Sequence, residues 1–351
     1  MSLLLFDLQS DAEGTGIIMV QNSILDWLLE TSDPAVRAAT LTSLCQKSEN
    51  DPEVLTTRKA MMASVPIAKI LSLQNPDGSW GLEERFYDDK YTGSVWTLLT
   101  LAELGADSED PRIHRACEFI LGHSQDPDEY GFSMRQSAKT HAGLPGYVIP
   151  CLTGNLVYAL IRFGYLQDER IQNAIAWILK YQQADDGSLH GPQDPIVKRL
   201  EPCFGRHTCH MGVAKALKAL AAIRGGLRTP AVTAKIGELA EYFLIHHLYR
   251  KSHDLAQISK PGWLHFGFPL MYQTDILELL EIFATLHLRD PRLDDAIAVV
   301  AGKQDAEGRW LLENSYNGKM LIRIEQKGTP SKWITLKAMN VLREFRPDAI
   351  R

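Results

Sequence analysis

Apolar residues recur at helical spacing along most of this chain, in two kinds of stretch that alternate. One kind is rich in Leu, Ala and Val on nearly all faces, which indicates a helix buried on most sides. The other is apolar on one face only, as expected for an outer helix. Sustained two-residue alternation, the signal of a strand, is lacking. The predicted inner helices span 95–104, 152–163, 211–223, 276–286 and 335–342, and the predicted outer helices span 113–121, 171–181, 232–248 and 293–300.

The outer stretches begin with recognisable helix-start signals. Asp110-Pro111, Thr229-Pro230 and Asp290-Pro291 each place a capping side chain before a proline at the first helical position, and Asp168 caps without a proline. These caps recur about every 60 residues. Each unit is therefore a helix hairpin. A single hairpin cannot bury its apolar face alone, so neighbouring hairpins must stack, either in an open solenoid or in a closed ring.

A glutamine, a short polar linker, a glycine and usually an aromatic residue follow four of the helical stretches. The Asp-Gly step makes a tight turn, and the aromatic ring can then stack on the glutamine amide and plug the outer helix end. This arrangement favours the closed ring. The sequence thus predicts an all-α fold, an α/α toroid of stacked hairpins. The four copies are Gln74–Trp80, Gln125–Phe132, Gln183–Leu189 and Gln304–Trp310.

The segment Gln-x-x-Asp-Gly-Ser-Trp resembles the "QW" repeat of squalene and oxidosqualene cyclases, and the related loops of protein prenyltransferase β subunits. The resemblance covers residues 65–345. It implies a toroid domain over 64–351 with a central cavity, and a helical extension over 1–63 that completes the ring or packs on it. The glutamine–aromatic contacts are structural in these families, so the repeat indicates a fold rather than an activity.

Composition narrows the class of protein. The net charge of -6 argues against nucleic acid as a partner, because binding phosphates needs a basic surface. No apolar run is long enough for a transmembrane helix. Met1–Phe6 is too short for a signal peptide. The five scattered cysteines then predict reduced thiols in a cytoplasmic protein.

Candidate chemistry concentrates where the inner helices begin, because their free amides face the cavity mouth. Cys203, His207, Cys209 and His210 lie within eight residues, and thiolate and imidazole ligands suit Zn²⁺. Cys151 begins the preceding inner helix and is a neighbour if the ring is correct. We therefore predict a zinc site made from Cys151, Cys203, His207 and one of Cys209 or His210. The alternative is that the cysteines are small buried hydrophobes and the histidines cap a helix.

The resemblance to zinc-dependent prenyltransferase β subunits bears on the same residues. Those proteins hold zinc through an Asp-x-Cys at one inner-helix start and a His-Thr at a later one. His207-Thr208 is similar to the second element and Cys151 to the first, but Ile149 stands at the aspartate position, where Cys203 would substitute. The resemblance also implies a helical partner subunit. The basic diphosphate pocket of the family is matched only loosely, by Arg135, Lys139 and His141.

Further polar and aromatic residues are candidates for the rest of the site. Asp275 and Tyr272, at the fourth inner helix, are candidate catalytic or ligand-orienting groups, with a solvent-facing helix cap as the alternative. Residues 249–268 lack the glutamine turn and are a candidate lid. The candidate substrate-binding residues, which could equally be core residues or structural ion-pair partners, are Trp96, Asn155, Arg206, Trp263 and Trp333.

Three functions remain open from the sequence. The first is a zinc-containing toroid enzyme that acts on a hydrophobic, isoprenoid-like small molecule. The second is a metal-independent enzyme similar to terpenoid cyclases, although their Asp-x-Asp-Asp acid is matched only superficially by Arg292–Asp295. The third is a non-catalytic toroid that binds lipid or protein and whose zinc is structural.

Overall fold

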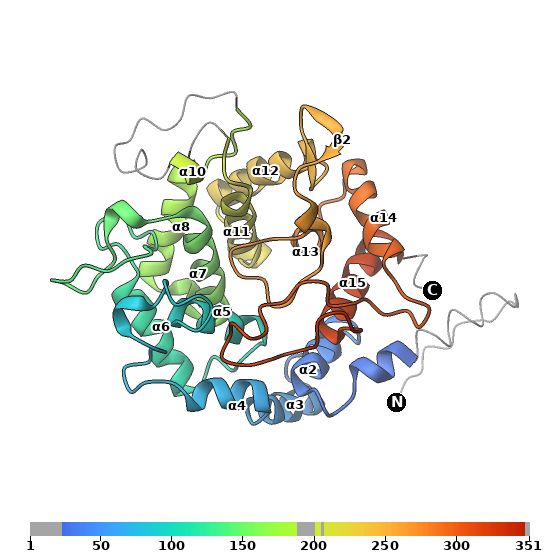
Figure 1. The fold of residues 1–351 in the computed structure, drawn as a ribbon, viewed down its shortest axis with the longest axis horizontal. Coiled ribbons are helices and arrows are strands. Elements are labelled where there is room, and N and C mark those ends of the chain that lie inside the picture. Colours follow the sequence, from blue (N-terminus) through green and yellow to red (C-terminus); the bar gives the residue numbers. More distant parts are fainter. Residues whose placement is uncertain (1–22, 188–200, 205–206, 348–351) are drawn as a thin grey trace, which may run out of the picture.

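The computed structural model describes residues 23–187, 201–204 and 207–347, and in this part of the chain nearly all regular structure is helical. Figure 1 shows the helices arranged as a ring with an inner and an outer layer. The predicted all-α toroid is confirmed. The inner helices are α5 (Ser94–Glu103), α7 (Pro150–Arg162), α11 (His210–Ala221), α13 (Ile276–Leu286) and α15 (Lys332–Phe345), and the outer helices are α6 (Pro111–His123), α8 (Glu169–Tyr181), α12 (Pro230–Ile245) and α14 (Asp294–Gly302).

The predicted caps begin the outer helices. The Asp110 carboxylate accepts a hydrogen bond from the Arg112 amide at 2.8 Å, and Asp168 accepts from the Arg170 amide at 2.9 Å. Asp290 caps a short 3-10 turn, Pro291–Leu293, that leads into α14. These bonds satisfy amides that the first helical turn leaves free, which is why the caps locate the helices so well.

The glutamine repeat has a physical role in the ring. The Gln74 side-chain amide donates to the Gly78 carbonyl at 3.1 Å and to the Arg112 carbonyl, in the first turn of α6, at 2.8 Å. The Trp80 indole donates to the Ile70 carbonyl at 2.9 Å, near the end of the helix before the turn. The second copy makes the same pair of amide bonds, from Gln125 to the Tyr130 carbonyl and to the Arg170 carbonyl of α8, both at 2.9 Å. In the fourth copy Gln304 donates to the Gly308 carbonyl at 3.0 Å, and the Trp310 indole donates to the Val300 carbonyl of α14 at 2.7 Å. The third copy extends to Leu189, which lies outside the described residues.

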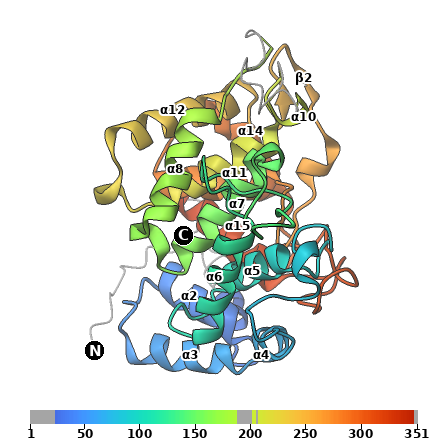
Figure 2. The same ribbon diagram turned by 90° about the vertical axis from the view of Figure 1, so that its left-hand side faces the viewer.

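The N-terminal helices lie against the last inner helix. Residues 23–28 are helical, and α2 (Pro34–Ser43), α3 (Pro52–Met62) and α4 (Val65–Ser72) follow. The Arg343 guanidinium of α15 donates to the Ser43 carbonyl at 2.7 Å. In both views α3 and α4 lie together on the outside of the ring beside α2 (Figures 1 and 2). Residues of the predicted extension thus contact the end of the toroid domain, and the boundary at residue 63 stays a prediction.

Two short strands, one short helix and several 3-10 turns complete the regular structure of the described residues. Strands β1 (Arg250–Lys251) and β2 (Asp254–Ile258) pair antiparallel within the stretch that lacks the glutamine turn. Helix α10 (Glu201–Phe204) lies between α8 and α11. No described helix has both the length and the apolar character that a membrane span requires. The remaining 3-10 turns are Glu83–Arg85, Pro145–Tyr147, Tyr165–Gln167, Gly225–Leu227 and Pro261–Leu264.

Charged side chains of the inner helices meet inside the ring. The Lys215 ammonium of α11 lies 2.7 Å from both oxygens of Glu278 of α13, and the two side chains are 0% and 3% exposed. Lys218, one turn later, donates to Glu278 at 2.9 Å and to Glu103 of α5 at 2.6 Å. Since α7 separates α5 from α11 in the ring, the Lys218–Glu103 bond bridges inner helices that are not neighbours. We call Glu103, Lys215, Lys218, Glu278, Glu281 and Lys337 the interior ion network.

Candidate functional site

Aromatic rings gather where the inner helices begin. Trp96, in the first turn of α5, has its ring centroid 5.0 Å from Tyr87, 5.3 Å from Tyr91 and 6.1 Å from Tyr272. Tyr316, from the loop before α15, lies 4.2 Å from Tyr91. The Trp96 indole donates to the Tyr87 carbonyl at 2.8 Å, which fixes the ring. These five residues form the aromatic cluster.

A cation already lies against this cluster. The ammonium nitrogen of Lys90, an exposed residue, lies 4.8 Å from the Tyr272 ring centroid, 5.1 Å from that of Tyr87 and 5.7 Å from that of Trp96. Each distance is within the range over which the negative face of an aromatic ring attracts a cation. Three π faces therefore converge on one positive charge, and the geometry fits a cationic or strongly polarised ligand group.

Three phenols of the cluster stay neutral at neutral pH. Burial, with a further contribution from Tyr272, raises the pKa of Tyr91 to about 12. Burial also raises the pKa values of Tyr87 and Tyr316 well above that of a free phenol. These three residues thus offer aromatic faces and hydroxyl groups but no phenolate, so their affinity for a cation comes from the rings.

The cysteines predicted to bind zinc lie close to the cluster and to one another. Burial, with contributions from Cys209 and Cys203, raises the pKa of Cys151 to about 12, and burial raises that of Cys203 to about 11. Such thiols are protonated at neutral pH in the absence of a metal. Among the described residues, no three of the five predicted ligands bring their ligand atoms within 4.8 Å of one another. As arranged, these side chains do not form a ligand set.

The two histidines of that prediction have other contacts. The His210 Nδ1 atom hydrogen-bonds with the Tyr242 hydroxyl, and the His210 ring lies 4.7 Å from the rings of His246 and Trp263. Burial and neighbouring His246 lower the pKa of His210 to about 3, so the ring is neutral. His207 is exposed, and its ring occupies the space where a Cβ atom at Gly187 would lie. A zinc ion at this cluster would require these contacts to change, and it stays a prediction.

Asp275 is the N-cap of α13. Its carboxylate oxygens accept from the Glu278 amide at 2.9 Å and from the Gly267 amide at 3.0 Å. The residue is only 2% exposed, so it is a buried cap and not the solvent-facing cap that was the alternative prediction. Burial raises its pKa to about 7. A carboxyl group with this pKa holds its proton in a large fraction of molecules at neutral pH.

The predicted substrate-binding residues separate in the structure. Only Trp96 lies in the aromatic cluster, together with the predicted catalytic residue Tyr272. The Asn155 amide donates to the Met271 carbonyl at 3.0 Å and joins α7 to the segment before α13. Trp333 stacks on Phe268 with ring centroids 4.4 Å apart. Trp263 contacts His210, and Arg206 lies outside the described residues.

The sequence places Tyr91 and Trp96 together at one inner-helix start, but it does not bring Tyr87 or Tyr316 to them. Tyr87 lies in a loop with no motif, and Tyr316 follows more than 200 residues later. Tyr91 preceding the helix that carries Trp96 was the available signal, since it places two aromatic rings at one inner-helix start.

A cavity of about 460 Å³ lies at the C-terminal ends of α7 and α11, and charged side chains line part of it, among them Arg162, Lys218, Glu281 and Lys337. Apolar side chains, including Ile223 and Ile282, line it as well. The hydrophobic central cavity expected from the sequence stays a prediction. An apolar ligand placed among these charges would compete with their ion pairs, so the aromatic cluster is the better candidate site for it.

The solved structures that resemble this chain do so only at low sequence identity and low TM-score. No family model and no curated protein matches this chain. A protein from Actinoplanes is 14% identical over 94% of this chain and 98% of its own, with a TM-score of 0.44. The type II terpene cyclase MstE from Scytonema is 15% identical over 93% and 98%, with a TM-score of 0.44.

A third solved structure matches at the same TM-score. It is a possible member of the GH105 family from Salmonella enterica, 11% identical over 98% of this chain and 97% of its own, with a TM-score of 0.44. At such identities the function has to be argued from the residues of this chain.

Proposed function

We propose that this protein is a terpenoid cyclase-like enzyme that binds an isoprenoid-like substrate at the aromatic cluster. The observation that carries the proposal is the position of the Lys90 ammonium over Tyr87, Trp96 and Tyr272. A protonated alkene is a carbocation, and convergent aromatic faces stabilise a cation without supplying a nucleophile that would trap it. Lys90 is exposed and tethered by a flexible stem, so a substrate can displace it.

In this proposal Asp275 supplies the proton. It follows Tyr272 by three residues, and burial raises its pKa to about 7. The carboxyl proton would be transferred to one alkene carbon, the π-electron pair would form the new C–H bond, and the carbocation would form on the other carbon. The π-electron pair of a second alkene in the same substrate would attack that carbocation and form the C–C bond that closes a ring, which moves the cation to a new carbon. Transfer of a proton from a neighbouring carbon to the Asp275 carboxylate would then form the product alkene and restore the acid.

A second proposal is that the cysteines bind a zinc ion. It is supported by the proximity of Cys151, Cys203 and Cys209, whose charges affect one another's pKa values. A bound metal would lower the pKa of these thiols and hold them as thiolates. A zinc-dependent prenyl transfer would then share the aromatic cluster as the site for the isoprenoid. Zinc binding by the wild-type protein that is lost in Cys151→Ser would favour this second proposal over the first.

The cation preference of the cluster can be measured directly. We expect a geranylgeranyl-trimethylammonium probe to bind about tenfold more tightly than its neutral tert-butyl isostere, because desolvated cation–π contacts contribute up to about 2 kcal/mol. Trp96→Leu should remove this preference and Lys90→Met should strengthen cation binding severalfold. Calorimetric titration of the full chain with both probes gives the two affinities.

A matched control is a tryptophan outside the cluster that also has cations over its ring. Trp27 also has cations over its ring, at 4.4 Å for Arg309 and 5.6 Å for Lys332, but it is not in the cluster. Trp27→Leu should leave the preference unchanged. Equal affinities for the two probes, or equal effects of the two tryptophan variants, would contradict the proposal. Probe binding with no product from geranylgeranyl substrates would favour a non-catalytic lipid-binding toroid.

A further inference from the structure

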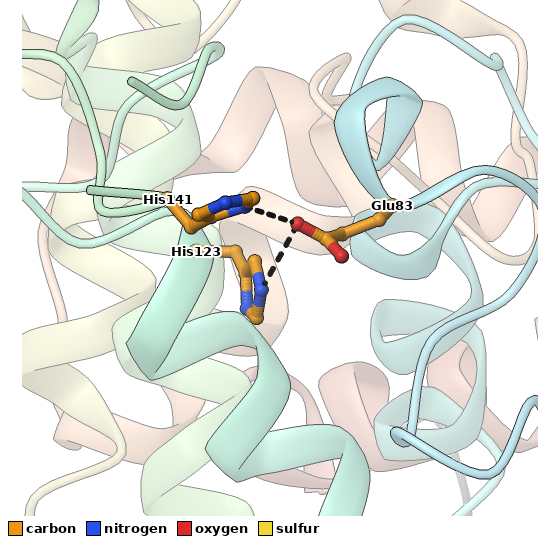
Figure 3. Close-up of side chains that lie close together, drawn as sticks. All are labelled: Glu83, His123 and His141. Carbon is orange, nitrogen blue, oxygen red and sulfur yellow. Dashed lines mark hydrogen bonds and ion pairs between the residues drawn. The ribbon is translucent and has the colours of Figure 1, made fainter. Parts of the chain in front are cut away.

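Two histidines and a glutamate from separate elements converge on one point at the rim of the ring. Glu83 lies in the 3-10 turn before α5, His123 is the last residue of α6, and His141 lies in the loop between α6 and α7. Their ligand atoms all lie within 4.8 Å of one another. Figure 3 shows both imidazole rings directed at the same Glu83 carboxylate. We infer that Glu83, His123 and His141 form a binding site for a divalent transition metal, with zinc as the expected ion.

The spacing of the ligand atoms fits such an ion. Tetrahedral zinc with bonds of about 2.0–2.1 Å holds its ligand atoms about 3.4 Å apart. The His123 Nε2 atom lies 3.4 Å from the Glu83 Oε1 atom. The His141 Nδ1 atom lies 2.7 Å from the same oxygen. Because His141 is exposed, its ring is free to move outward by the roughly 0.7 Å that an inserted ion requires.

The tautomer of His123 provides an independent argument. Its Nδ1 atom lies 2.9 Å from the Phe119 carbonyl oxygen, which only accepts, so Nδ1 carries a hydrogen. The Nε2 atom is then the ring nitrogen left to bind an ion, and it faces the Glu83 carboxylate oxygen at 3.4 Å. Phe119 also stacks on the His123 ring, with centroids 4.2 Å apart, and holds its orientation. Backbone carbonyls orient metal-binding histidines in this way.

Gln136 supplies the outer contacts of the site. Its amide nitrogen donates to Glu83 Oε1 at 3.0 Å, and its amide oxygen is buried with no hydrogen-bond partner. Three protein ligands leave the fourth tetrahedral position for water, as in zinc sites that do chemistry. A metal-bound water would donate to the unpartnered oxygen. Two imidazoles and one carboxylate favour zinc over magnesium or calcium, which prefer all-oxygen ligands.

The test is metal binding by the full chain after removal of metal with a chelator. We expect calorimetric titration to show one Zn²⁺ bound at this site, and affinity to fall at least about 100-fold in His123→Ala and in Glu83→Gln. Gln136→Leu should cost about tenfold, since outer contacts tune ligands without binding the ion. His287→Ala is the matched control, because His287 pairs with Glu344 at 3.4 Å with no third ligand in the described structure.

Two results would overturn the site. Absence of stoichiometric zinc binding by the wild-type chain would mean that the three residues form an ion pair only. Retention of full affinity in the His123→Ala/His141→Ala double variant would place the metal elsewhere. Titration with Co²⁺ locates it in that case, because a thiolate-to-cobalt charge-transfer band that Cys151→Ser abolishes would assign the ion to the cysteines. The replaced side chains are exposed or half-buried, so thermal unfolding of each variant with chelator present should stay close to that of the wild type.

Discussion

Replacing Glu278 by leucine is expected to lower the free energy of unfolding by about 3–5 kcal/mol, because it leaves the ammonium of Lys215 buried without its partner. Both oxygens of Glu278 lie 2.7 Å from that ammonium. Burial alone would raise the pKa of Glu278, but Lys215 and Lys218 lower it to about 2. The carboxylate therefore stabilises the fold above the unfolded-state pKa of 4.5, and this contribution is lost as pH falls toward 2.

Urea unfolding of a double-mutant cycle measures this effect. The Lys215→Met/Glu278→Leu protein should recover most of the lost stability, because a hydrophobic pair of similar volume often replaces a buried ion pair at little cost. The surface pair Lys180–Glu129, 3.1 Å apart, is the control, and Lys180→Met should change stability by less than about 1 kcal/mol. A loss below about 1 kcal/mol for Glu278→Leu would show that water reaches the network and that it is not a dry interior.

Gly154→Ala is expected to lower the free energy of unfolding by about 3 kcal/mol or more, through overpacking of α7 against α11. A Cβ atom at Gly154 would lie 2.4 Å from the Lys215 carbonyl carbon and 2.6 Å from the Ala216 amide nitrogen. Both neighbours are backbone atoms, so no side chain can rotate away. The whole of α11 would have to shift, together with the ion network that Lys215 anchors.

The control for this substitution is a glycine in open space. Gly237 lies within α12 and has no atom within 4 Å of an added Cβ. Gly237→Ala should raise stability by up to about 1 kcal/mol, because alanine has the higher helix propensity. Thermal or urea unfolding of both variants gives the comparison. A neutral Gly154→Ala would mean that α7 and α11 pack less closely than the structure has them.

Local signals made the helices predictable from sequence. Asp110 and Asp168 cap their helices through hydrogen bonds to amides two residues later. A few adjacent residues therefore determine where each helix begins. The glutamine turns combine a local bond, from Gln74 to Gly78, with a bond from Gln74 to Arg112 of the next outer helix. Helix caps form between residues that are close in the sequence, so they can be predicted without knowing the fold.

The sites depend on contacts between distant parts of the chain. Tyr316 reaches Tyr91 only after the ring closes, and His141 meets Glu83 only because two loops lie together at the rim. The ion network had an available signal: Lys215 and Lys218 lie three apart in an apolar helix, as do Glu278 and Glu281 in another. Complementary charges at one helical spacing predict that two buried helices face each other.

A crystal structure of the protein with geranylgeranyl-trimethylammonium bound tests the proposed site most directly. The account predicts that the quaternary nitrogen lies over the faces of Tyr87, Trp96 and Tyr272, and that the Lys90 ammonium has moved away from them. A probe nitrogen bound instead beside the charged side chains of the interior, with Lys90 still over the three rings, would contradict it.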